Sequence, residues 1–281
     1  MIAFLNGRFL PEDQAVVPIT DRGFLYGDGL FDTLRIHNAT PLWWSRHLAR
    51  LQRGAEFLRL KLPWPGTELR QHATELIAKN ALLDCILRIA VSRGSGARGY
   101  SIQGANSPTV AMTLHPLRPA PPSVRLATAT IRVPAHDPLS AIKTANKLPQ
   151  ILARAEAEER GADEALLLNV EGDVAEAASS NVFWIRNGTV CTPPVSAGAL
   201  AGVTREVVLE LCRAYQVPTA EESIARSALF GMDAVFLTNS GQGIVPVTEI
   251  DAQKLKSSPL VAQLREWLSA AEMAESQSPS A

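Results

Sequence analysis

Cysteine is scarce in this chain, and several patterns that mark particular protein classes are missing. The three cysteines, at positions 85, 191 and 212, show no CxxC spacing, which argues against a disulfide framework and a zinc site. The five histidines form no HExxH motif, so no metal site is expected. No apolar run approaches the ~18 residues of a membrane span, and the first residues lack a signal peptide's layout. We therefore expect a cytoplasmic protein with no membrane segment.

Neither basic nor acidic residues are in clear excess. The 27 basic and 28 acidic residues leave a net charge of −1, so no strong field draws nucleic acid. The 281 residues suffice for two domains. The proline-rich stretch PLRPAPPS, starting at Pro116, predicts a linker at 118–123 between a small N-terminal domain, 1–117, and a larger one, 124–281. Residues 272–281 are expected to form a disordered tail.

Lysine is rarer than arginine, at six against 21, and one lysine has an unusual setting. Lys143 lies between small or apolar neighbours, just before a predicted helix from Lys147 to Arg160. The predicted apolar face of that helix carries Leu148, Ile151, Leu152 and Ala155. Two strands and a turn follow, and Glu176 lies in the small-residue sequence VAEAASSN.

A lysine and a glutamate in such settings suit one particular chemistry. A buried lysine amine can hold an aldehyde cofactor as a Schiff base. In pyridoxal phosphate enzymes a carboxylate keeps the pyridine nitrogen protonated, and Glu176 is a candidate for this role. The alternative is that both are ordinary solvated surface residues, as most lysines and glutamates are. Spacing alone leaves both interpretations open.

Two further segments have both an ordinary and a functional interpretation. Gly94, Gly96 and Gly99 match GxGxxG after a strand, but turn-rich sequence follows instead of a helix, so we reject a dinucleotide site. A loop that contacts a small carboxylate is the better interpretation. A helix that starts at Gly202, Val203 and Thr204 either has an ordinary threonine cap or offers free backbone N–H groups to a phosphate.

Several separated motifs, in order, resemble the class IV aminotransferases. They are IKTAN, GADEALLLNVEGDVAEAASSNVFWI and CTPPVSAGALAGVTREVV. The resemblance implies the α+β, two-domain fold of fold-type IV pyridoxal phosphate enzymes, with pyridoxal 5′-phosphate as cofactor and a homodimer as the assembly. It also implies roles for the residues that match the motifs. Lys143 would carry the Schiff base and Glu176 would face the pyridine nitrogen. The cofactor phosphate would be held by Arg50 of HLARL, Val203, Thr204, Asn239 and Ser240. Candidates for the substrate pocket are Asp32, Thr33 and Arg35 in the segment YGDGLFDTLR and Arg98 in SRGSGARGYS.

Within the family, SRGSGARGYS and the TNS-x-x-G turn most resemble aminodeoxychorismate lyase. That activity converts 4-amino-4-deoxychorismate to 4-aminobenzoate and pyruvate in folate biosynthesis. Arg35 and Arg93 are candidates for a second substrate-carboxylate ligand. Gly241 departs from the larger apolar residue common in lyases, which keeps a second activity open, namely a transaminase for D-amino acids or branched-chain L-amino acids. A protein that has lost its activity is disfavoured, because Lys143 and Glu176 are both present.

Overall fold

The structure, a computed structural model, describes residues 1–277 and divides into two compact units. Unit 1 comprises residues 1–117, 142–146 and the chain from Glu272 onward, and unit 2 comprises residues 118–141 and 147–271. The segment 142–146, which carries Lys143, therefore groups with unit 1, whereas its place in the sequence had suggested the second domain. Two units of mixed helix and sheet agree with the expected α+β class.

Unit 1 is built on a six-stranded antiparallel sheet. Its strands, in spatial order, are β2 (Arg8–Pro11), β1 (Ile2–Leu5), β6 (Thr109–Pro116), β5 (Cys85–Ser92), β3 (Gly29–His37) and β4 (Thr40–Pro41). The β1–β2 hairpin turns through Asn6 and Gly7, whose φ angles are 49° and 85°. These left-handed values confirm the tight turn that Asn-Gly predicts.

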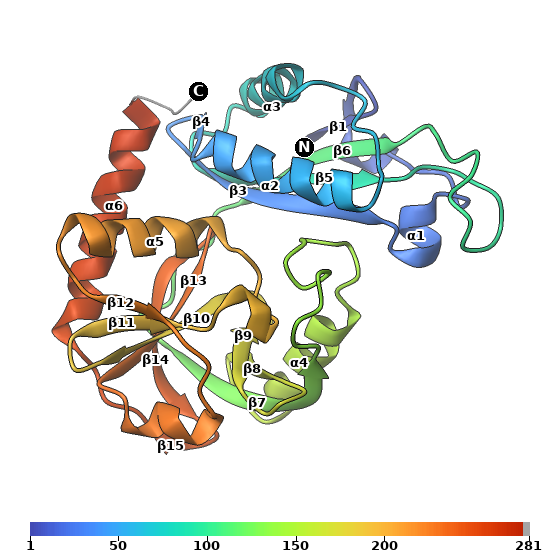
Figure 1. Cartoon of the computed structure of the whole chain (residues 1–281). Coiled ribbons are helices and arrows are strands. Elements are labelled where there is room, and N and C mark those ends of the chain that lie inside the picture. The colour runs from blue at the N-terminus through green and yellow to red at the C-terminus, as the bar shows by residue number, and fades with distance from the viewer. Residues whose placement is uncertain (278–281) are drawn as a thin grey trace. The chain divides into compact units, whose positions relative to one another are not determined.

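Three helices belong to unit 1, namely α1 (Arg22–Tyr26), α2 (Trp44–Phe57) and α3 (Gly66–Asn80). Figure 1 shows α2 and α3 on the same side of the sheet. Apolar side chains from both helices, including Leu51, Leu69 and Leu76, pack against Leu34 and Leu87 of the central strands. This core holds β3 in place, and β3 carries the candidate site residues Asp32, Thr33 and Arg35.

Unit 2 contains a nine-stranded sheet of mixed direction. Its strands, in spatial order, are β12 (Thr219–Glu221), β11 (Thr189–Thr192), β10 (Asn181–Arg186), β13 (Ala234–Asn239), β14 (Gly243–Ile250), β7 (Val124–Val133), β8 (Glu164–Asn169) and β9 (Val174–Ala177). The short strand β15 (Gln253–Lys254) pairs with β14. Strand β8 is buried along its whole length, as its unbroken apolar run ALLL indicates.

Helix α4 (Leu148–Glu159) forms where expected but presents a different face to unit 2. Ala153 and Ala157 are buried against β7 and β8, together with Ala129 and Ala165 of those strands. Small side chains on both surfaces let the helix lie close to the sheet, so the larger apolar side chains point away from it. The predicted apolar face is therefore wrong, and its leucines and isoleucine are exposed.

Two longer helices complete the structure. The spacing of Val203, Val207, Val208 and Leu211 predicts one apolar face for helix α5 (Val203–Ala214). The three valines are buried and Leu211 is half-buried. Helix α6 (Pro259–Gln277) contacts α5 through Trp267, whose ring stacks on that of Tyr215 with centroids 4.0 Å apart. The expected disordered tail at 272–281 is wrong for residues 272–277, because α6 continues to Gln277. Residues 278–281 lie outside the described part of the chain.

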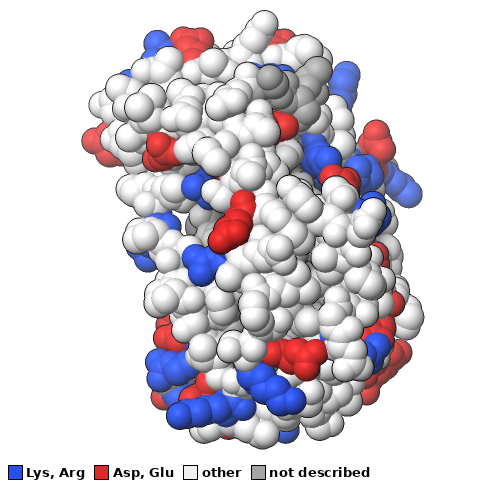
Figure 2. Space-filling model, turned by 90° about the vertical axis from the view of Figure 1, so that its left-hand side faces the viewer, with Lys and Arg blue, Asp and Glu red and all other residues white. Residues whose placement is uncertain are grey.

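The surface carries charges of both signs. Basic and acidic side chains are interspersed on the face shown in Figure 2, and the net charge is −1. Within residues 1–277, no helix combines the length and apolar character that crossing a bilayer requires. The same residues contain no group of three or more histidine, cysteine, aspartate or glutamate side chains placed to hold a metal ion.

Candidate functional site

The segment that carries Lys143 lies as a short strand along the beginning of β3. The backbone N–H of Phe31 donates to the Lys143 carbonyl at 3.0 Å, and that of Ala145 donates to the Gly29 carbonyl at 2.9 Å. Leu30 and Thr144 form the antiparallel bridge between these bonds. The paired backbone groups of Lys143 and Ala145 fix where the Lys143 side chain starts, which a solvated surface loop would not do.

Two cations meet one aromatic ring on this part of unit 1. The Lys143 Nζ atom lies 4.8 Å from the centroid of the Phe31 ring, and the guanidinium carbon of Arg88 lies 3.9 Å from it. Arg88 stands opposite Thr33 in the β3–β5 ladder. Burial lowers the pKa of Arg88. Its guanidinium makes no hydrogen bond or ion pair that the structure shows within residues 1–277, so its N–H groups are available to an anion.

Arg50, expected to bind the cofactor phosphate, lies in a buried polar cluster behind β3. Its Nε and Nη2 atoms donate to the Asp32 carboxylate at 3.0 and 2.8 Å, and His47 Nδ1 lies 2.7 Å from Asp32 Oδ1. Burial alone would raise the pKa of Asp32. The charges and hydrogen bonds of His47 and Arg50 outweigh it, and the pKa falls below its usual value. Asp32 is thus held ionised, and its carboxylate pairs with Arg50 and His47 of α2.

The arginines expected to bind substrate differ in how many hydrogen bonds they already make to other residues. Arg35 Nη1 donates to Glu272 at 2.8 Å, although Arg35 Nε is buried without a partner among residues 1–277. Arg93 donates to both oxygens of Asp28 and to the carbonyls of residues 58 and 59, so it is a structural residue. Arg98 is exposed on the loop after β5. That loop has no helix, which agrees with the rejection of a dinucleotide site.

Glu176 belongs to unit 2, on strand β9 and opposite Leu167 of β8. Its Oε2 atom accepts a hydrogen bond of 2.9 Å from the backbone N–H of Leu200. Lys147, just before α4, is close enough to Glu176 for their charges to interact. Burial lowers the pKa of Lys147, and the Glu176 carboxylate offsets part of that effect. The sequence did not reveal this pairing.

The start of α5 and the end of β13 together provide groups that fit a phosphate. Helix α5 has Gly202 at its N-cap, with no side-chain cap, so its first N–H groups remain available. Two hydroxyls, Thr204 Oγ1 and Thr238 Oγ1, are buried with no partner among residues 1–277. Unpaired buried hydroxyls are costly unless a ligand pairs with them. The expected cofactor phosphate supplies such a ligand, so these residues fit it.

Asn239 was predicted from the sequence to hold the cofactor phosphate, whereas Thr238 was not. The Asn239 amide oxygen accepts from the backbone N–H groups of Gly241 and Gln242, and its nitrogen donates to Ser180 Oγ. Asn239 therefore shapes the turn that follows β13, and Thr238 offers the unpaired hydroxyl. The polar run Thr-Asn-Ser marked this turn in the sequence. Only the folded structure shows that Asn239 pairs with Ser180 and Gln242, whereas the Thr238 hydroxyl has no partner among residues 1–277.

The chain is similar to known proteins along nearly its whole length. The model of the family described as amino-transferase class IV matches residues 29–250. A Methanocaldococcus jannaschii protein named as a branched-chain-amino-acid aminotransferase is 34% identical over 92% of this chain and 90% of its own. A D-alanine aminotransferase of Bacillus licheniformis is 30% identical, over 92% and 91%.

A solved structure with a third activity is as similar as these. The 4-amino-4-deoxychorismate lyase of Pseudomonas aeruginosa is 34% identical, with a TM-score of 0.85 over 95% of this chain and 98% of its own. All of these similar proteins are enzymes of one family, and enzymes of this family use pyridoxal phosphate, the cofactor expected from the sequence. The chain belongs to the class IV aminotransferases, a family of enzymes that depend on pyridoxal phosphate.

Proposed function

We propose that this enzyme is an aminodeoxychorismate lyase, which converts 4-amino-4-deoxychorismate to 4-aminobenzoate and pyruvate in folate biosynthesis. The supporting observation is the loop SRGSGARGYS after β5, which resembles the lyase version. Gly94 has φ +80°, and an added Cβ would lie 1.8 Å from the Ser107 carbonyl oxygen. Only glycine fits there, so the motif encodes a specific loop path instead of a generic flexible turn.

The substrate carries two carboxylates, and unit 1 offers arginines for them. Arg35 and Arg93 were the sequence candidates for the second carboxylate, but one pairs with Glu272 and the other with Asp28. Arg88, which the sequence did not indicate, contacts the same Phe31 ring as Lys143 and pairs with no carboxylate among residues 1–277. We assign Arg88 to one substrate carboxylate and keep the exposed Arg98 for the other.

We infer the residue roles from the resemblance to the family, and the contacts described above support them. The cofactor, when bound, withdraws electrons from the carbon that bears the substrate amine. Lys143 Nζ removes the proton from that carbon, because the backbone pairing along β3 fixes where its side chain begins. Glu176 holds the pyridine nitrogen protonated. The hydroxyls of Thr204 and Thr238 and the first N–H groups of α5 bind the phosphate. The bond between the ring carbon and the enolpyruvyl oxygen then breaks and leaves an aromatic ring, and the released enolpyruvate takes up the proton held by Lys143 and becomes pyruvate.

A transaminase for D-amino acids or branched-chain L-amino acids is the second candidate. The 34% and 30% identities to aminotransferases named above favour it. The same lysine would move a proton in either reaction, so the catalytic residues do not distinguish the two. The two activities differ in the substrate that they accept and in the product that they release, so an assay with both kinds of substrate distinguishes them.

Assaying the purified, cofactor-loaded protein separates these activities. We expect pyruvate release from 4-amino-4-deoxychorismate to exceed amino transfer from each member of a panel of L- and D-amino acids. Arg88→Gln should lower kcat/KM for pyruvate release by roughly 10- to 100-fold, the cost of an unpaired bound carboxylate. Arg53→Gln, at an exposed position of α2, is the matched control and should not change it. Undetectable pyruvate release beside ready transamination of D-alanine or L-leucine would refute the lyase assignment.

We also propose a homodimer in the cytoplasm. The free thiols of Cys85, Cys191 and Cys212 are all buried, which fits a reducing compartment. The exposed apolar side of α4 supports self-association, because contiguous apolar surface on a soluble protein commonly marks an interface.

A further inference from the structure

Strand β7 separates from β8 in the middle of their ladder and leaves a hollow in unit 2. Thr128 pairs with Leu166, and the next pair is Arg132 with Leu168. Between these two pairs β7 advances by four residues, whereas β8 advances by two. Bulges of this kind redirect side chains and are frequent beside binding sites. The hollow has a volume of about 430 Å³, within the usual range for small-molecule sites. It is lined by Thr128, Ala129, Thr130, Arg132, Arg160, Leu168, Arg226 and Asp251.

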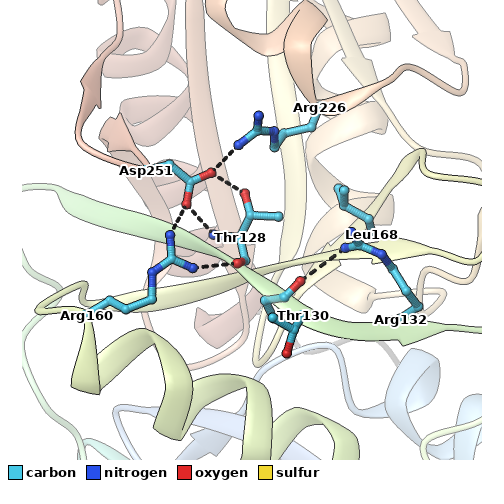
Figure 3. A pocket seen from close by; sticks show the side chains of 8 residues that line it. Thr128, Thr130, Arg132, Arg160, Leu168, Arg226 and Asp251 are labelled. Atoms are coloured by element: carbon cyan, nitrogen blue, oxygen red, sulfur yellow. Dashed lines mark hydrogen bonds and ion pairs between the residues drawn. The ribbon is translucent and has the colours of Figure 1, made fainter.

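Asp251 organises one side of this hollow, as Figure 3 shows. Its Oδ1 accepts from the Thr128 backbone N–H at 2.8 Å and from Arg160 Nη2 at 2.7 Å. Its Oδ2 accepts from the Thr128 hydroxyl and from Arg226 Nη1. Burial alone would raise the pKa of Asp251, but these hydrogen bonds and the nearby arginines lower it, so the carboxylate stays ionised. One carboxylate thus holds two guanidinium groups at the edge of the hollow.

The third arginine of the lining, Arg132, makes no bond to Asp251 that the structure shows. Arg132 Nη1 donates to the Ala129 carbonyl at 3.1 Å, and none of its bonds shown by the structure goes to a carboxylate. The lining therefore has three guanidinium groups and one carboxylate. Glu156 lies outside the lining, 3.6 Å from Arg160 at its nearest oxygen, and its other oxygen is taken by Thr130. The hollow remains cationic after both acids are counted.

We propose that this hollow binds a small oxyanion with two or more negative charges, either a phosphate group or a di- or tricarboxylate. Arg160 Nη1 also donates to the Thr128 carbonyl at 2.8 Å. Each guanidinium has five N–H donors, and these hydrogen bonds use one in Arg132, one in Arg226 and two in Arg160. Fork-shaped donors match the oxygens of such anions. A purely structural role would need only the arginines that brace Asp251. None of the residues assigned to cofactor or substrate lines the hollow.

Calorimetric titration of the cofactor-loaded enzyme tests the proposal, since loading fills the cofactor's own phosphate site. The probes are inorganic phosphate and citrate, at constant ionic strength kept with chloride. We expect saturable, submillimolar binding of at least one probe, and the better probe identifies the source of the charge. Arg132→Gln and Arg226→Gln should each weaken it about tenfold or more. Arg125→Gln removes an exposed arginine of the same strand that pairs with Asp163, and it should bind like the parent.

Arg132→Gln is the decisive variant, because its exposed side chain loses only one bond to a backbone carbonyl. The Arg226 variant releases Asp251 as well, so its circular dichroism spectrum is compared with the parent's before titration. Binding of neither probe, or equal affinity in the parent and the Arg132 variant, overturns the proposal.

Discussion

Lys143 and Lys147 lie four positions apart, yet they have different contacts in the structure. Lys143 is held by backbone bonds to β3, whereas Lys147 interacts with Glu176 in unit 2. We predict that Lys143→Ala abolishes turnover and the cofactor absorbance that borohydride treatment removes. Lys147→Ala, the matched control, should keep both. The reverse pattern in absorbance spectra recorded before and after borohydride would show that the cofactor is attached to Lys147.

Asp32 gives a residue-scale prediction about acid stability. Its pKa in the folded enzyme lies below the ordinary value of 3.8, because the effects of His47 and Arg50 outweigh that of burial. The ionised group therefore adds stability that is complete above about pH 4 and declines as the pH falls below that value. Asp32→Asn should destabilise the enzyme by roughly 3–5 kcal/mol at pH 7, the cost of breaking a buried ion pair.

The pH dependence of that loss is the diagnostic result. The difference in free energy of unfolding between parent and Asp32→Asn should shrink by about 1.4 kcal/mol for each pH unit below about 3.8. Urea unfolding from pH 7 to pH 2 measures it, with the exposed Asp13→Asn as control. A difference that is constant across this range would mean that Asp32 is not held ionised.

At the scale of an element, the N-terminus of α5 is expected to bind the cofactor phosphate. Thr204→Val removes a buried hydroxyl that has no partner among residues 1–277 and keeps the side-chain shape. We predict an affinity for pyridoxal phosphate weaker by about tenfold or more, the loss of one hydrogen bond to a charged group. The cofactor-free protein should be as stable as the parent or slightly more stable.

Two measurements separate a binding role from a structural one. Fluorescence titration with pyridoxal phosphate gives the affinity, and thermal unfolding of the cofactor-free protein gives the stability. Thr74→Val removes a hydroxyl on α3 that bonds the Arg70 carbonyl, and its cofactor affinity should match the parent's. Unchanged affinity in Thr204→Val would exclude this hydroxyl from the phosphate site.

At the scale of the whole molecule, the exposed side of α4 predicts how copies associate. Leu148, Ile151 and Leu152 are 63%, 61% and 48% exposed and lie on one side of the helix. Burying each would contribute about 1.5–3 kcal/mol. Light scattering should give about 61 kDa, twice the 30.3 kDa chain, and about half that for Ile151→Asp. Leu83→Asp, at another exposed leucine, should stay dimeric. A parent protein that is monomeric and fully active at micromolar concentration would contradict the dimer.

Features that depend on neighbouring residues could be predicted from the sequence. Local rules predict the Asn-Gly hairpin, the helix that starts at Val203 and the buried strand β8, because each depends on turn geometry or a short periodicity. Ordered motifs along the chain also identified the family, which the match to residues 29–250 confirms.

The contacts between side chains that lie far apart in the sequence become known only from the folded structure. Periodicity places Leu148 and Ala153 on different faces of α4, but not which face meets the sheet, and small residues on β7 and β8 selected the alanines. Likewise, the sequence lists Arg35, Arg88 and Arg93 without saying which of them meets a carboxylate. Glu272 lies 237 positions from Arg35 and Asp28 lies 65 from Arg93, so folding alone brings these pairs together and leaves Arg88 without one. Such contacts are non-local, and a charge or hydrogen bond acts through distance in space, not along the chain.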